Sequence, residues 1–142
     1  MKKITIIFGS STGNTEKVAL MIKDHLIGFD TEVINVVNSN ASMIKTADLV
    51  LLGSSTWGYG EIQDDFLDFY DSMNTDLLGG KNVGVFGCGD SQSFSDVFCK
   101  AVDLIIEKAS DCGASVLGDE LRVDGEVEDN LSAIEAFAKQ FV

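Results

Sequence analysis

The stretch KITIIFGSSTGNT, residues 3–15, decides the fold of this chain. Residues 3–8 are almost entirely apolar and rich in isoleucine, which is typical of a strand buried on both faces of a parallel sheet. Residues 9–15 are small or polar, and beyond them Val18, Ile22 and Leu26 recur at helical spacing. The stretch therefore predicts a strand, a polar loop and a helix, which together open an α/β unit.

The same alternation of apolar strands and amphipathic helices continues along the chain. Further strands are predicted at residues 31–37, 47–52, 82–86 and 114–117. Further helices are predicted around residues 66–73, 98–109 and 127–141, with a loop and a short helical turn at 38–46. Five strands that alternate with helices predict an α/β fold, a three-layer α/β/α sandwich around a five-stranded parallel sheet. We expect the strand order 2-1-3-4-5 and, because no repeat or linker interrupts the pattern, a single domain over residues 1–142.

Composition and charge exclude several classes of protein. The net charge of −13 would repel nucleic acid and anionic membranes. No run of about 18 apolar residues predicts a membrane span, and the N-terminus lacks the features of a signal peptide, so we expect a cytoplasmic protein. The three cysteines, Cys88, Cys99 and Cys112, form no CxxC motif, and their odd number argues against a disulfide framework.

The loop over residues 9–15 is a candidate phosphate site. It precedes a helix, whose N-terminal amides and dipole favour an anion. Four hydroxyls, the Asn14 amide and the permissive Gly13 backbone could surround a phosphate. The loop holds no Lys or Arg, so it is not a Walker P-loop, and neutral donors favour a phosphate monoester. Helix capping is the alternative interpretation, but it needs only one or two of these side chains.

Two further strand ends carry candidate ligand-binding loops. The predicted strand at 47–52 leads into GSSTWGYG (53–60), which holds the only tryptophan, Trp57. Stacking on a flat ring is one interpretation, worth roughly 0.5–1.5 kcal/mol beyond burial, and packing of Trp57 over the sheet edge against Tyr59 is the other. The predicted strand at 82–86 leads into GCGDSQSF (87–94). In open α/β sheets, ligands bind where such loops meet.

In chain order, these three loops resemble the flavin-binding loops of the flavodoxin family. The matching patterns are G-[ST]-x-T-G-N-T, S-x-T-W-G-x-G-E-x-Q and G-x-G-D-x-x-x-[YFW]. The resemblance implies that the FMN phosphate is bound by Ser10, Ser11, Thr12, Gly13, Asn14 and Thr15. It implies that the flavin ring is bound by Ser54, Ser55, Thr56, Trp57, Gly58, Tyr59, Gly60, Gly87, Cys88, Gly89, Asp90 and Phe94.

The resemblance also gives some of these residues individual roles. Trp57 or Tyr59 would cover one face of the ring, and Phe94 the outer face, in place of the more common tyrosine. The carbonyl of Gly58 would rotate to accept the N5–H of reduced flavin, which stabilises the neutral semiquinone. Asp90 would accept a hydrogen bond from the flavin N3–H. For Cys88, packing is a simpler interpretation than redox chemistry.

The function implied is that of a low-potential, one-electron carrier, not an enzyme. Anionic hydroquinone would lie in loops without cations on a chain of net charge −13, which disfavours the second electron. A few kcal/mol of repulsion lowers the second potential by on the order of 100–200 mV. We expect a monomer whose acidic surface meets redox proteins, reductases and oxidoreductases, with basic docking faces.

Three alternatives follow from the same fold class. An FMN-dependent reductase would need extra segments for NAD(P)H, which 142 residues hardly supply. A phosphoacceptor signalling domain would need carboxylates where Gly9-Ser10 and Gly53-Ser54 stand. A flavodoxin-like activator of a metalloenzyme is the third alternative.

Residues 118–129 leave no room for the insertion of long-chain flavodoxins, although the second and third loops have long-chain-like spacing, so we expect a short-chain member.

Overall fold

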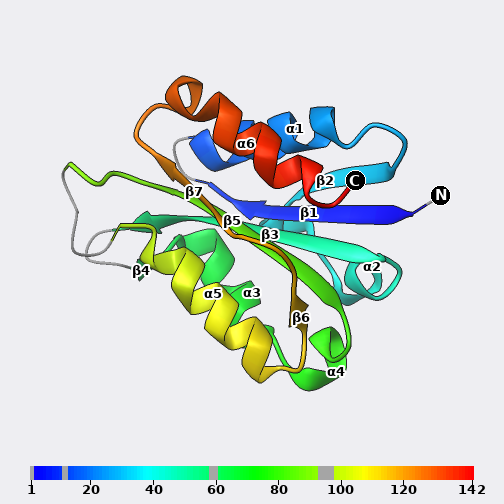
Figure 1. Cartoon of the computed structure of the whole chain (residues 1–142). Coiled ribbons are helices and arrows are strands. Elements are labelled where there is room, and N and C mark those ends of the chain that lie inside the picture. Colours follow the sequence, from blue (N-terminus) through cyan, green and yellow to red (C-terminus); the bar gives the residue numbers. More distant parts are fainter. Residues whose placement is uncertain (1, 11–12, 58–60, 93–97) are drawn as a thin grey trace.

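The computed structural model of this chain describes residues 2–10, 13–57, 61–92 and 98–142, in which strands and helices alternate (Figure 1). The strands are β1 (Lys3–Gly9), β2 (Asp30–Asn35), β3 (Leu49–Trp57), β4 (Glu61–Ile62), β5 (Asn82–Gly89), β6 (Ser115–Val116) and β7 (Leu121–Asp124). The helices are α1 (Asn14–His25), α2 (Ala41–Lys45), α3 (Asp64–Ser72), α4 (Thr75–Leu78), α5 (Lys100–Asp111) and α6 (Leu131–Lys139), with short 3₁₀ helices η1 (Val36–Asn38) and η3 (Val127–Asn130).

The strands form one sheet in the order β2-β1-β3-β5, with β6 and β7 both parallel to β5 on its outer side. The predicted order 2-1-3-4-5 is therefore confirmed, with β5 as the fourth strand and β6 and β7 sharing the fifth place. The register places Gly9 beside Ser54, and Ser54 beside Gly87. The carboxyl ends of β1, β3 and β5 thus lie next to one another, and each leads into one of the three predicted loops.

Helices cover both faces of the sheet, as the predicted three-layer sandwich requires (Figure 1). On one face, Val18 and Ile22 of α1 pack with Phe137 of α6 against the strands. On the other face, Phe66 of α3 and Ile105 of α5 belong to a second buried cluster. Full burial of each such side chain contributes about 1.5–3 kcal/mol, so the two clusters hold the strand ends in place.

The fifth strand differs from its prediction at 114–117. β6 is only two residues long, the chain turns at Gly118 (φ 66°), and it rejoins β5 as β7. The Gln140 side chain stabilises the turn between β6 and β7. Its amide oxygen accepts from the Asp119 N–H (2.9 Å), and its amide nitrogen donates to the Asp119 carbonyl (2.8 Å). β7 was not predicted, because only two of its four residues are apolar and it lies among acidic residues.

Candidate functional site

The first loop leaves β1 at Gly9 and enters α1 at Asn14. Gly13 precedes the helix in a left-handed conformation (φ 92°), and no described side chain caps the helix amides. The Gly13 N–H donates to the Ser10 hydroxyl (N···Oγ 2.9 Å), which joins the two described ends of the loop. The first-turn amides of α1 are therefore oriented to bind an anion. Ser11 and Thr12 lie outside the described residues.

Thr15, in the first turn of α1, carries the clearest sign of a ligand-binding role. Its side chain is fully buried, yet its hydroxyl has no hydrogen-bond partner of ordinary geometry in the described part of the chain. Its polar neighbour is the thiol of Cys88, which is a weak hydrogen-bonding group. A buried hydroxyl without a partner is costly, so its presence at a helix N-terminus fits a phosphate oxygen as the missing acceptor.

The basic residue nearest to the first loop in the sequence, Lys17, is held in an ion pair. Lys17, in the next part of α1, pairs with the carboxylate of Glu128. The described portion of the loop therefore offers backbone amides, hydroxyls and the exposed Asn14, as the sequence predicts. This donor set suits a phosphate monoester better than a triphosphate with a metal ion.

The second loop begins at the end of β3, whose last residues pair with β4 in an antiparallel hairpin. Ser54 is fully buried; its hydroxyl accepts from the Gln63 N–H (3.2 Å) and donates to the Ser55 carbonyl (2.9 Å). The Thr56 hydroxyl accepts from the N–H of Ala101 in α5 (3.0 Å). The hydroxyls of Ser54 and Thr56 are thus used inside the protein, and they fix the loop backbone.

The ring-facing residues of the second loop are only partly described. The backbone of Trp57 closes β3 beside Glu61 of β4. The Trp57 side chain, and all of Gly58, Tyr59 and Gly60, lie outside the described part of the structure. Which of the two aromatic residues covers the ring therefore stays a prediction.

The third loop leaves β5 at Gly89 and is held by β7. Asp90 is exposed and accepts a hydrogen bond from the Gln92 N–H (3.0 Å). Ser91 donates to the Asp124 carboxylate through its N–H (2.9 Å) and its hydroxyl (2.5 Å). Gly89 accepts from the N–H of Gly125 (2.9 Å). Phe94 lies outside the described residues, so its place on the ring stays a prediction.

Asp124 is a supporting residue that the sequence did not single out. It stands in an acidic stretch, which is typical of a solvated face, and its link to Ser91 spans 33 residues. An Asp-Gly pair, here residues 124 and 125, signals a turn, but it does not show what the carboxylate binds. Only the register of β7 on β5 brings the two together.

The Asp124 tether predicts a pH dependence of the third loop. The two Ser91 donors hold the pKa of Asp124 below its ordinary value of 3.8. Because the folded-state pKa is the lower one, the tether stabilises the fold above pH 3.8 and is lost as the pH falls through the lowered pKa. We expect hydrogen-exchange protection of the Ser91 amide to persist at neutral pH and to disappear in strong acid.

Asp124→Asn tests this expectation by NMR-detected hydrogen exchange at neutral pH. The variant keeps an oxygen acceptor but loses the negative charge that strengthens the bond, so it should reduce protection at Ser91, whereas Asp76→Asn on α4 should keep it with the same change of charge. Equal protection at Ser91 in wild type and Asp124→Asn would contradict the tether.

The cysteines are free and buried. Burial raises the pKa of the Cys88 thiol from 9.0 to about 11, although the Thr15 hydroxyl offsets part of the rise. Burial also raises the pKa of Cys99 to about 12. Both thiols are thus kept protonated at neutral pH, which favours packing over redox chemistry for Cys88.

These pKa values predict slow thiol chemistry in the folded protein. A rise from 9.0 to about 11 leaves the Cys88 thiolate about 100-fold scarcer at pH 8, and burial hinders access further. Titration with a disulfide reagent should therefore detect no fast-reacting thiol in the native protein and three in denaturant. A fast native thiol that mass spectrometry maps to Cys88 would show the prediction to be wrong.

A cavity of about 620 Å³ lies away from the three loops, between η1 and α2 on one side and α3 and α4 on the other. Apolar residues such as Phe69 and Leu77 and three aspartates line it, and none of the predicted site residues does.

Among the described residues, no cluster of His, Cys, Asp and Glu could hold a metal ion. No described helix has the length and apolar character needed to cross a membrane.

Together, the fold and the loops define a class of protein. It is a doubly wound α/β protein in which three adjacent strand ends meet at the carboxyl edge of the sheet, the place where ligands bind in such folds. The N-terminus of α1 lies at the first of these strand ends and offers neutral hydrogen-bond donors.

Comparisons with known proteins identify the family. The flavodoxin family profile matches residues 6–137. The flavodoxin of Maridesulfovibrio salexigens is 46% identical over 136 residues, which cover 90% of either chain. Flavodoxin 1 of Escherichia coli K12 is 38% identical over 113 residues, 80% of this chain and 64% of that protein. The crystal structure of oxidised flavodoxin 1 from Bacillus cereus has a TM-score of 0.84 at 36% identity and covers 99% of both chains.

The chain therefore belongs to the flavodoxin family, as a short-chain member. It is an FMN-based electron carrier, not an enzyme, and it works with redox partner proteins. The family resemblance, the fold class, the cofactor and the general function predicted from the sequence are confirmed.

Proposed function

We propose that residues 1–142 form one domain that binds one FMN across the three strand-end loops. The first loop (10–15) holds the phosphate, and the second (54–60) and third (87–94) hold the ring. The observation that carries this assignment is the buried Thr15 hydroxyl at the N-terminus of α1, whose polar neighbour among the described residues is only the weak thiol of Cys88. The register that places Gly9, Ser54 and Gly87 in a row supports it.

The residues at the N-terminus of α1 have the chemistry needed to bind the phosphate of FMN. Amides of the first turn of α1, the Thr15 hydroxyl and the side chain of Asn14 supply donors, and the helix dipole adds partial positive charge. The left-handed Gly13 leaves open space beside its Cα, where a Cβ would meet no described atom within 4 Å. An anion can therefore approach the backbone closely there.

At the ring end, the chain supplies shape and negative charge. FMN, when bound, supplies one-electron chemistry, and the protein sets the reduction potential of each one-electron step. Asp90 and Asp124 place carboxylates beside the third loop, and Lys17 is neutralised by Glu128. We propose that this surplus of negative charge lowers the potential at which the second electron is accepted.

The acidic surface also suggests how partners dock. Asp64, Asp65 and Asp68 lie in α3, which follows the second loop, and all three are exposed. We propose that this side of the molecule meets basic faces of redox proteins, and that the chain acts as a monomer in the cytoplasm. The buried free thiols are consistent with a reducing compartment.

Reductive titration of the purified protein tests the proposed function. We expect one FMN per chain and two separate one-electron reductions, of which the second has a lower potential than that of free FMN. Transfer to cytochrome c, used as a basic redox protein, should slow as ionic strength rises. Absence of bound FMN, or steady oxidation of NAD(P)H without a partner protein, would contradict the proposal.

A further inference from the structure

We propose that Arg122 is a positioning residue for the flavin ring, because it fixes the first turn of α5, to which the second and third loops are both attached. This inference rests on the proposed FMN site. Arg122 is the only arginine of the chain and lies in β7, a strand that the three loop patterns do not include.

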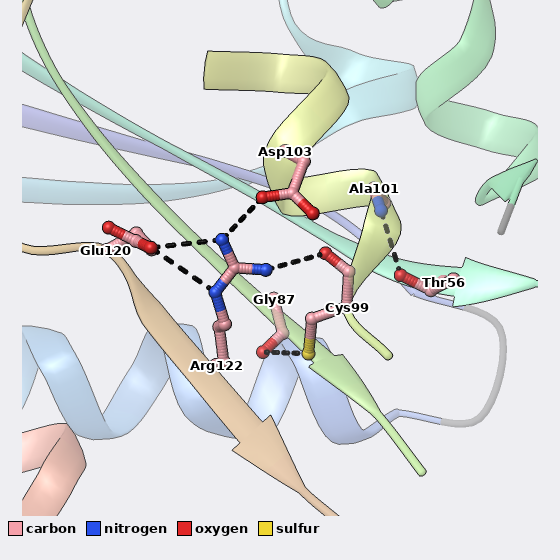
Figure 2. A network of polar contacts seen from close by, with 7 residues as sticks. All are labelled: Thr56, Gly87, Cys99, Ala101, Asp103, Glu120 and Arg122. Atoms are coloured by element: carbon pink, nitrogen blue, oxygen red, sulfur yellow. Dashed lines mark hydrogen bonds and ion pairs between the residues drawn. The ribbon is translucent and has the colours of Figure 1, made fainter. Parts of the chain in front are cut away.

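The first turn of α5 joins the two ring-binding loops (Figure 2). From the second loop, the Thr56 hydroxyl accepts a hydrogen bond from the Ala101 N–H at 3.0 Å. From the third loop, the chain reaches α5 through Cys99, the residue directly before the helix. A shift of residues 99–101 therefore moves an end of both loops.

Cys99 needs outside support to keep its conformation. Its backbone is left-handed (φ 50°, ψ 33°), and it is the only residue other than glycine with a positive φ in the described part of the chain. Residues other than glycine keep such a conformation only where their surroundings enforce it. Cys99 is fully buried, and its thiol has only weak contacts at 3.9 Å to the carbonyls of Gly87 and Val123.

Arg122 supplies support from outside α5, beside the 2.9 Å hydrogen bond that the Val102 N–H donates to the Cys99 carbonyl. One terminal nitrogen donates to the Cys99 carbonyl at 3.3 Å. The other donates to the carboxylates of Asp103 at 2.6 Å and Glu120 at 3.0 Å, and Nε also donates to Glu120. Figure 2 shows the guanidinium between these three groups. The planar fork thus ties β7 to both the residue before α5 and the first turn of α5.

Arg122 could affect flavin binding through its charge or by positioning the loops, and these two effects predict different results for FMN and riboflavin. Two carboxylates surround one guanidinium, so the cluster as a whole is negative and presents no net positive charge to the site. If Arg122 acted through its charge alone, its removal would weaken the binding of anionic FMN and spare neutral riboflavin. If Arg122 acts by placing the ring loops, its removal weakens the binding of both flavins by the same factor.

The test is a titration of apoprotein with FMN and with riboflavin, followed by quenching of flavin fluorescence. We expect Arg122→Met to weaken both flavins about tenfold, as for the loss of one hydrogen bond to a charged group, with their affinity ratio unchanged. Arg122→Lys, which keeps the charge but not the fork, should restore only part of the affinity. Lys139→Met, which breaks a surface pair with Glu135, should bind both flavins like wild type.

Circular dichroism of each apoprotein checks the fold. If Arg122→Met does not fold, Asp103→Asn takes its place, because it removes the charge of the closest partner of the guanidinium, and a smaller equal loss for both flavins is expected. Unchanged affinity in the folded variants, or a loss confined to FMN, would overturn the inference. Failure of the wild-type chain to bind FMN would instead remove the proposed function itself.

Discussion

Replacing Thr15 by valine is expected to weaken FMN binding by about 10- to 100-fold while leaving the apoprotein equally or more stable. The hydroxyl is buried without a partner in the described residues, so it stabilises the apoprotein little, and an isosteric methyl group removes its desolvation cost. In the proposed complex, the same hydroxyl donates to a charged phosphate, an interaction of roughly 1.5–3 kcal/mol. The two effects have opposite signs, which general damage to the fold would not produce.

Fluorescence titration with FMN and urea unfolding of the apoprotein measure the two effects of Thr15→Val. Riboflavin, which has no phosphate, should bind the variant like wild type. The chain offers a matched control in Thr31→Val, because the Thr31 hydroxyl of β2 is also buried without a partner but lies far from the loops. Thr31→Val should leave FMN affinity unchanged; equal losses in both variants would contradict the role of Thr15.

Gly87→Ala is expected to destabilise the protein by roughly 3 kcal/mol, at the upper end of the cost of overpacking. A Cβ at Gly87 would lie 2.5 Å from the backbone oxygen of Ser54 and 2.6 Å from a methyl group of Val102. The first of these is a backbone atom of the neighbouring strand, so it cannot turn away as a side chain could. The strand ends of β3 and β5 would have to separate where the second and third loops begin.

Thermal and urea unfolding measure this loss, which corresponds to a fall in Tm of roughly 6–12 °C for a chain of this size. Gly28→Ala is the matched control, because Gly28 has a positive φ (91°) but open space around it. It should cost about 1 kcal/mol, from backbone conformation alone. Equal destabilisation by the two substitutions would show that the contact between β3 and β5 is looser than described.

The sequence predicted the fold where its signals were local and periodic. Residues 3–8 and 47–52 read as buried strands because nearly every side chain is apolar, and α1 follows the spacing of Val18 and Ile22. The divided fifth strand was missed, since β7 has only two apolar residues. The helix predicted from Phe98 begins at Lys100, because Cys99 takes a left-handed conformation that periodicity does not reveal.

The candidate site was predicted less completely, because its supports are distant in sequence. Asp124 and Arg122 hold the third loop and the start of α5 from β7, and nothing near the loop motifs points to them. Motifs also do not show which way a side chain points. Alternate residues of a strand share a face, so Ser54 and Thr56 both bond within the protein, and the backbone of the loop remains for the ligand.

The most direct test of the central claim is a comparison of amide NMR spectra of the apoprotein with and without FMN. If three adjacent strand-end loops hold the flavin, the largest shifts will fall on residues 10–15, 54–60 and 87–94. Shifts centred instead on residues 36–45 and 65–77, which line the cavity between α2 and α3, would place the ligand elsewhere and contradict the account.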